Sequence, residues 1–153
     1  MTRYSTAQPP RPLFVAEPPA VWHLRQPVVV DCSLLAALLW GEAEAQPAAE
    51  ALLGKALHAP QLLAYELANV ARNKARSGAD ADASMAGLQA FAELRVVLHP
   101  QAADSVQELA ALAQRYALTA YDAAYLMLAG QLQAPLLSFD QRLAEAAARH
   151  LSA

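Results

Sequence analysis

Cysteine is almost absent from this 153-residue sequence, which contains Cys32 alone. A single cysteine excludes an intramolecular disulfide framework and a cysteine-rich zinc site, and it suits a reducing cytoplasm. A net positive charge is also lacking: the formal charge of −3 excludes a nucleic-acid partner held by bulk positive charge alone. Charged residues interrupt the apolar segments too often for a membrane span, and no apolar run typical of a signal peptide is present.

Glycine is scarce as well, with five residues, whereas alanine and leucine are abundant, with 38 and 25 residues. Few glycines and many good helix formers predict long helices with close alanine contacts and few strands. The length suits one compact domain, and a hydrophobic fraction of 56% is too high for a disordered chain.

Proline is concentrated at the start of the chain, where six of the ten prolines lie within the first 27 residues. This segment has no sustained periodicity, so residues 1–26 are predicted to form a mostly extended leader. The folded domain is predicted to span residues 27–153. Its first element is a buried parallel strand, because Val28, Val29 and Val30 form a β-branched run without polar alternation.

Short apolar runs alternate with helical patterns along the rest of the domain. Further strands are predicted at about residues 96–100 and 135–138, and residues 59–60 are predicted to be a short strand or a turn. Helices are predicted over about residues 33–40, 44–57, 61–76, 80–93, 102–116, 119–130 and 140–150. Ser33 is the predicted cap of the first helix, and Thr119 opens the sixth in a capping box. The alternation predicts an α/β fold: a Rossmann-like three-layer sandwich with a short central parallel sheet flanked by helices.

Charged residues are nearly missing from three long segments, which cover residues 26–41, 56–71 and 116–141. These 58 residues contain four formal charges, all of them carboxylates: Asp31, Glu66, Asp122 and Asp140. No lysine or arginine shares a segment with them. Because an unpaired carboxylate is costly to bury, each needs a partner from elsewhere in the fold, from solvent or from a metal ion.

Three of these acids are expected at one edge of the sheet. Asp31 and Asp140 follow predicted strands, and Asp122 lies in the first turn of an apolar helix. In open parallel sheets, ligands bind beyond the carboxyl ends of the strands, where helices begin. Glu66, on the third predicted helix, can face the same cleft. Carboxylates gathered there would repel one another without a divalent cation, and oxygen ligands favour Mg²⁺ or Mn²⁺, ions that bridge a phosphate and activate water.

Each acid also has an ordinary structural interpretation. Asp31 and Asp140 suit the N-caps of the helices that follow them, and Asp122 suits the third helical position of the capping box. Glu66 suits a solvated helix face. These roles are common, but they leave the isolation of the four acids and their shared edge unexplained.

Polar neighbours of the acids are further candidates. Ser33 and Ser138 each lie two residues from a candidate acid and are expected to cap a helix or to hydrogen-bond to Asp31 and Asp140. Asn69 lies one turn after Glu66 on a polar stripe of the same helix.

A basic cluster of Arg72, Lys74 and Arg76 ends the helix that bears Glu66. Two interpretations stay open: a solvated helix C-terminus, favoured by the helix dipole, or a contact with a phosphate backbone. The four histidines have no metal-like spacing, and Cys32 is expected to pack as a small hydrophobe. Glycine-rich nucleotide-binding motifs are absent.

Four segments of this sequence resemble the PIN-domain family, and within it the VapC-type toxins of bacterial toxin–antitoxin pairs. They are residues 28–33 (VVVDCS), 64–70 (AYELANV), 118–126 (LTAYDAAYL) and 135–143 (PLLSFDQRL). In order and spacing the resemblance covers about residues 27–150. The leader is outside it.

The resemblance implies a Mg²⁺- or Mn²⁺-dependent ribonuclease that cuts single-stranded or looped RNA and leaves a 3′-hydroxyl and a 5′-phosphate. Asp31, Glu66 and Asp122 fall on family positions that bind the metal, and Asp140 falls on the more variable fourth acidic position. The family also implies a homodimer and inhibition by a small VapB-like antitoxin. The alternatives are a catalytically silent PIN-like module that binds RNA or protein and, less consistent with the motifs, a Rossmann-like phosphohydrolase or receiver domain.

Overall fold

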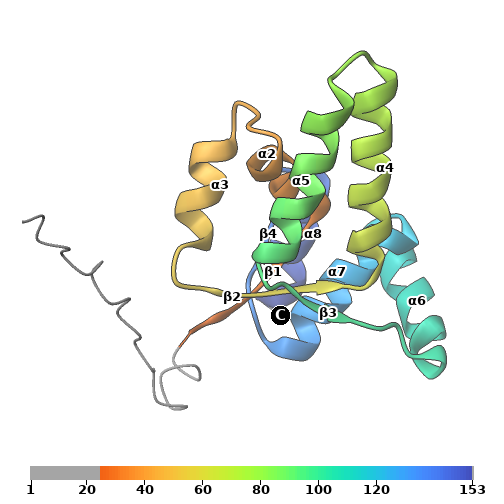
Figure 1. Cartoon of the computed structure of the whole chain (residues 1–153). Helices are drawn as coiled ribbons and strands as arrows, with labels where there is room; N and C mark the ends of the chain where they lie inside the picture. Colours follow the sequence, from red (N-terminus) through yellow and green to blue (C-terminus); the bar gives the residue numbers. More distant parts are fainter. Residues whose placement is uncertain (1–24, 153) are drawn as a thin grey trace, which may run out of the picture.

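The computed structural model describes residues 25–152 (Figure 1). Nearly all of the predicted leader, and His23 with it, lies outside the described residues. In chain order the elements are β1 (Pro27–Val30), α2 (Cys32–Leu39), α3 (Ala45–Leu52), β2 (Ala56–Pro60), α4 (Leu62–Arg76), α5 (Ala81–Glu93), β3 (Val97–His99), the 3₁₀ turn η1 (Ala103–Ser105), α6 (Val106–Tyr116), α7 (Ala120–Leu132), β4 (Leu136–Leu137) and α8 (Gln141–Leu151). No helix among residues 25–152 is long and apolar enough to cross a membrane.

The four strands form one parallel sheet in the order β3-β2-β1-β4. In the register of the sheet, Val28 of β1 lies opposite Leu57 of β2, and Val30 lies opposite Leu137 of β4. The valines of β1 are buried because strands flank them on both sides and helices cover them. Because the strands are parallel, their carboxyl ends meet at one edge of the sheet, and Asp31 follows β1 directly at this edge.

Helices cover the sheet in two groups. The first is centred on α7, which is buried from Ala123 to Ala129 and packs against β1, β2 and β4, with α6 and α8 beside it. The second consists of α2, α3, α4 and α5, which pack on one another; Figure 1 shows α3, α4 and α5 above the strands, with α4 and α5 side by side. Leu35 and Leu63 from this group join the β1 valines in one core. The predicted three-layer α/β sandwich is confirmed.

The second predicted helix, over residues 44–57, is wrong at its C-terminal end. The helix α3 stops at Leu52, and Gly54 adopts a left-handed conformation with φ +70°, which glycine reaches without steric cost. The chain then enters β2, where the backbone N–H of Ala56 donates to the carbonyl of Gln26 at 3.0 Å. Residues 55–57 suit either a helix or a strand locally, and pairing with β1 decides between them.

Candidate active site

Asp31 lies at the centre of the site, between the end of β1 and the start of α2. Its side chain is 5% exposed and accepts a hydrogen bond from the backbone N–H of Leu34 at 3.0 Å, so that Asp31 is the N-cap of α2. The prediction that Ser33 caps this helix is wrong, because α2 begins at Cys32 and Ser33 lies within its first turn. The capping interpretation of Asp31 and its candidate role in the site are therefore compatible.

Two serine hydroxyls hold the Asp31 carboxylate. Ser33 Oγ lies 2.9 Å from both carboxylate oxygens, and Ser138 Oγ donates to Oδ2 at 2.7 Å. The expected contacts of both serines with Asp31 are thus present. Their oxygens also accept backbone N–H groups: Ser33 Oγ that of Phe139 at 2.9 Å, and Ser138 Oγ that of Asp140 at 2.8 Å. The start of α2 is thereby tied to the segment that follows β4.

Asp140 is exposed and belongs to the same edge through this serine. Its carboxylate accepts the backbone N–H of Leu143 at 3.0 Å and is the N-cap of α8, as one interpretation of the sequence proposed. Its backbone N–H, rather than its carboxylate, is bound to Ser138.

Glu66 lies on α4 and is half-buried. The hydroxyl of Tyr125 donates a short hydrogen bond to its Oε2. Tyr125 is a buried residue of α7 that sequence analysis did not assign to the site. One signal was available: Tyr125 lies three residues after Asp122, on the same helical face, and carries the one polar group of the otherwise apolar run 123–129.

Asp122 lies in the first turn of α7 and is half-buried. Its backbone N–H donates to Thr119 Oγ1 at 3.1 Å, and the Thr119 hydroxyl donates to its Oδ2 at 2.7 Å. The predicted N-cap at Thr119 is confirmed, but the reciprocal bond differs from that of a capping box, because the Asp122 carboxylate accepts the Thr119 hydroxyl and not its backbone N–H. Among residues 25–152, no hydrogen bond engages the other carboxylate oxygen of Asp122.

Electrostatics link Asp31, Glu66 and Asp122. Burial raises the pKa of Asp31, although hydrogen bonds from Ser138, Leu34 and Ser33 oppose the shift. Burial also raises the pKa of Glu66; the Tyr125 hydrogen bond opposes this shift, and the charges of Asp31 and Asp122 add to it. The groups that shift these two pKa values include no lysine or arginine of the described chain. Glu66 therefore lies close enough to Asp31 and Asp122 to be repelled by both, and no lysine or arginine of residues 25–152 offsets its shift.

The carboxylates nevertheless do not converge on one point. Within residues 25–152, no three histidine, cysteine, aspartate or glutamate side chains are grouped closely enough to hold a metal ion as they are oriented. The carboxylates of Asp122 and Asp140 instead hydrogen-bond to residues three positions away, and that of Glu66 accepts the hydroxyl of Tyr125 on α7. As a donor set, the carboxylate oxygens fit Mg²⁺ or Mn²⁺ and not zinc.

The family model of the PIN domain matches this chain over residues 28–149. The chain belongs to the PIN-domain family. Ribonuclease VapC3 of Pyrobaculum aerophilum is 34% identical over 124 residues, which are 77% of this chain and 92% of that protein, and this likeness places the PIN domain described here among the VapC-type members. The crystal structure of PAE2754 from Pyrobaculum aerophilum is similar in fold, with a TM-score of 0.62 and 25% identity over 83% of this chain and 88% of that chain.

Other predicted residues of this PIN domain lie farther from the acids. Asn69 is exposed one turn after Glu66. Lys74 forms an ion pair with Glu42 at 2.7 Å and lies 5.7 Å from the centre of the Trp40 ring, so it is already engaged within the fold. Arg72 and Arg76 are exposed, roughly 9 and 15 Å beyond Glu66 along the axis of α4.

Cys32, His58 and His99 are engaged within the fold of this PIN domain. Burial, and then the charges of Glu66, Asp31 and Glu42, raise the pKa of the Cys32 thiol to about 12, which keeps it protonated. His58 and His99, which are 41 residues apart, meet across β2 and β3 with Nδ1 and Nε2 2.9 Å apart. This contact follows from strand pairing and could not be read from their spacing in the sequence.

Proposed function

We propose that this PIN domain is a divalent-metal-dependent endoribonuclease that hydrolyses RNA phosphodiester bonds, and that it is the toxin of a toxin–antitoxin pair. The observation that carries the proposal is geometric: Ser138 joins Asp31 and Asp140 at the carboxyl edge of the sheet, and Tyr125 ties Glu66 to α7, which bears Asp122. Membership of the PIN family and the likeness to a protein named ribonuclease VapC3 support the same activity.

Asp31, Glu66 and Asp122 would hold the ion, directly or through water, with Asp140 as the more variable fourth carboxylate. Mg²⁺ or Mn²⁺ supplies activation of a water molecule and neutralisation of charge on the phosphate and the leaving oxygen. The fit rests on the donor chemistry: oxygen ligands from three parts of the chain, with raised pKa values at Asp31 and Glu66.

The chain itself pre-orients these carboxylates. Ser33 and Ser138 fix Asp31, and the Tyr125 hydroxyl fixes Glu66. Three of the acids also lie at helix N-termini, since Asp31 and Asp140 cap α2 and α8 and Asp122 lies in the first turn of α7. The positive ends of these helix dipoles offset part of the mutual repulsion of the carboxylates.

Partners follow from the same assignment. The substrate is RNA, with Arg72, Lys74 and Arg76 as candidate contacts to its phosphates, and Asn69 is a candidate partner of Glu66. By likeness to VapC-type proteins, we propose a homodimer in the cytoplasm that a VapB-like antitoxin inhibits by entering the acidic cleft.

The experiment measures cleavage of a labelled RNA that carries single-stranded loops, with Mg²⁺, Mn²⁺ or EDTA. Wild type should cut only with metal and leave 5′-phosphate ends. Asp31→Asn, Glu66→Gln and Asp122→Asn should each lower the rate by at least about 100-fold because each removes a ligand charge.

Asp82→Asn is the matched control, because Asp82 is an exposed acid in the first turn of α5. It should cut like wild type. Full activity of Asp31→Asn would contradict the assignment, and Mn²⁺ binding that is absent or independent of the carboxylates would indicate a catalytically silent module.

A further inference from the structure

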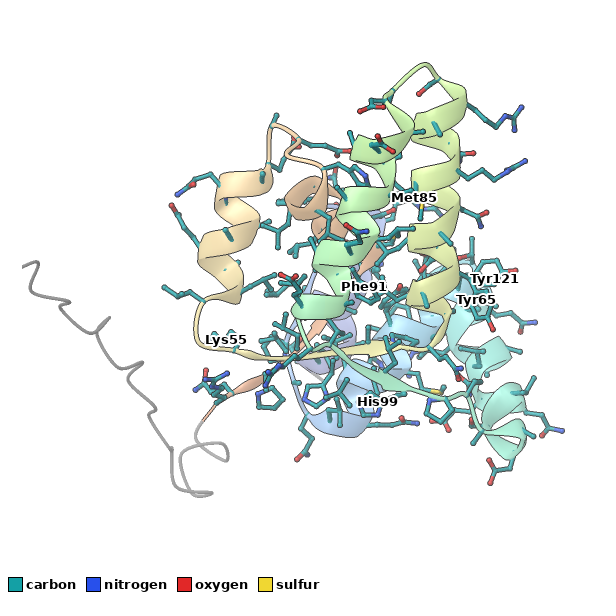
Figure 2. All side chains as sticks on the ribbon, in the orientation of Figure 1. Lys55, Tyr65, Met85, Phe91, His99 and Tyr121 are labelled. Carbon is teal, nitrogen blue, oxygen red and sulfur yellow. The ribbon has the colours of Figure 1, made fainter. Side chains whose placement is uncertain are left out.

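Three aromatic side chains stay exposed beside the acids. Tyr65 is 70% exposed, Tyr121 is 67% exposed and Phe139 is 42% exposed. Each directly precedes one acid in the sequence: Tyr65 precedes Glu66, Tyr121 precedes Asp122 and Phe139 precedes Asp140. Figure 2 shows Tyr65 and Tyr121 on the same side of the molecule, at the end of α4 nearest the sheet. Rings of this size normally lose solvent contact on folding, so the exposure of three rings that each precede a candidate acid needs a cause.

No internal contact explains these rings. Among residues 25–152, no hydrogen bond or ring contact engages the side chains of Tyr65, Tyr121 or Phe139. Other large aromatic residues of the described chain are engaged: Tyr125 binds Glu66, the Trp40 indole N–H donates to the carbonyl of Ser84 at 3.2 Å, and Tyr116 pairs with His150.

We propose that Tyr65, Tyr121 and Phe139 form a base-stacking rim that receives unpaired bases of single-stranded RNA on either side of the phosphate that a cation at the carboxylates would hold. The proposal rests on the proposed nuclease function and names the part of the substrate that the protein grips. Aromatic faces accept any base, so the rim gives affinity and a requirement for unpaired nucleotides rather than a sequence code.

The charge distribution favours this occupant. The net charge is −3 and the acids themselves repel a phosphate backbone, so electrostatic attraction supplies little affinity for RNA. Stacking on rings is the other general source of affinity for single strands, and it does not depend on positive charge. A base-paired helix hides its base faces, so only looped or single-stranded RNA can use the rim.

A protein partner fits the same residues less well. The three rings come from α4, α7 and the segment before α8, and a carboxylate follows each of them. Protein interfaces concentrate apolar residues in a core depleted of charge, whereas here a carboxylate follows each ring directly in the chain. Rings beside a cation-binding site match a nucleotide, which presents a base next to a phosphate.

The test compares Tyr65→Leu, Tyr121→Leu and Phe139→Leu with the ring-preserving variants Tyr65→Phe, Tyr121→Phe and Phe139→Tyr. Met85→Ala removes an equally exposed apolar side chain from α5 and is the control. Binding of a labelled 12-nucleotide single-stranded RNA is followed by fluorescence anisotropy in EDTA at two salt concentrations. Each Leu variant should bind about 5- to 100-fold more weakly, with an unchanged salt dependence, and the ring-preserving variants should bind like wild type.

Two further readouts exclude a merely structural effect. In Mn²⁺ the Leu variants should raise KM with little change in kcat, because stacking holds substrate and transition state alike. Wild type should bind an RNA with a single abasic nucleotide at the contacted position more weakly than the intact RNA. The matching Leu variant should bind the two RNAs with equal affinity.

Unchanged binding by all three Leu variants would overturn the proposal. So would a lower molar mass of these variants in light scattering together with normal RNA binding, because the rings would then join two copies of the chain. If wild type binds RNA through the rings but cuts none with any ion, the stacking rim stands and the nuclease assignment fails.

Discussion

The Ser138 hydroxyl donates a 2.7 Å hydrogen bond to Oδ2 of Asp31, and so joins residues 107 positions apart in the sequence. The two residues follow neighbouring parallel strands, β4 and β1, so the bond forms only when the sheet has formed. Because Ser138 Oγ also accepts the backbone N–H of Asp140, one hydroxyl sets the position of two candidate acids. The site is thus fixed by the sheet edge rather than by a local motif.

Ser138→Ala should therefore lower both stability and activity. The substitution removes one donor from a buried carboxylate, and a hydrogen bond to a charged group contributes about 1.5–3 kcal/mol. RNA cleavage should fall about 10- to 100-fold, as is common when a partner of a metal ligand is removed. Urea unfolding and the cleavage rate in Mn²⁺ measure the two effects.

Ser138→Thr should restore most of both losses, because it keeps the hydroxyl. Ser77→Ala is the matched control: Ser77 is exposed at the end of α4 and donates to the carbonyl of Lys74. Equal losses in the alanine and threonine variants would show that packing, and not the hydroxyl, matters at position 138.

Much of this fold was predictable because its signals are local. The Val28–Val30 run, the Thr119 N-cap and the acid that follows each strand are all visible in a few adjacent residues. The four acids were found by what surrounds them, since no other charge lies near them in the sequence. The C-terminal end of α3 was missed because Gly54 and the pairing of β2 with β1 override a helical pattern.

Contacts between distant elements could not be predicted in the same way. The Tyr125 bond to Glu66 and the pairing of His58 with His99 depend on which helix and which strand lie side by side. The orientations of Asp122 and Asp140 are local results instead, because Asp122 binds Thr119 and Asp140 caps α8, each through a residue three positions away. The sequence identified the carboxylates, whereas the direction in which each carboxylate points depends on these hydrogen bonds.

Asp31→Asn should stabilise the metal-free protein at pH 7.5. Burial raises the pKa of Asp31, so its ionised form destabilises the folded state, and this cost appears as the pH rises through the raised pKa. Asparagine keeps an oxygen that can accept the N–H of Leu34 without the charge. Thermal melts in EDTA should show a higher Tm for the variant at pH 7.5, and the difference in Tm should shrink as the pH falls through the raised pKa of Asp31.

The sign of the difference in Tm between Asp31→Asn and wild type decides this prediction. Loss of stability in Asp31→Asn at pH 7.5 would mean that the ionised carboxylate is favoured by its hydrogen bonds more than burial opposes it. Excess Mn²⁺ should reverse the order, because a cation bound to the carboxylate stabilises wild type more than the variant.

Gly87→Ala should destabilise the protein by about 1–3 kcal/mol, although alanine is the better helix former. Gly87 is buried in α5, and a Cβ there would lie 2.4 Å from Cε2 and 2.6 Å from Nε1 of Trp40. The ring cannot withdraw freely, because its indole N–H is bound to the carbonyl of Ser84. Urea unfolding measures the loss.

A matched pair checks the cause of this effect. Gly130→Ala on α7 would meet only the tip of His150, at 3.2 Å, and should change stability by less than about 1 kcal/mol. In the Gly87→Ala background, Trp40→Phe should recover part of the loss because it removes the clashing atoms. No recovery would contradict the steric explanation.

His58→Gln should weaken the dependence of stability on acid pH. Burial, and then the charge of His99, lower the pKa of His58, so the unfolded chain takes up a proton at a higher pH than the folded protein. Stability from this group is therefore fully present above pH 6.5 and is lost as the pH falls from there through the lowered pKa. Without His58, the loss in unfolding free energy between pH 7.5 and pH 5.5 should be smaller, as urea unfolding at both values will show. Because the variant is compared with wild type, the opposite contribution of Asp31 cancels. Equal losses in the two proteins would mean that the ring pair at β2 and β3 is protonated without cost, and a titration of the His58 ring by NMR would then place its pKa at the ordinary value.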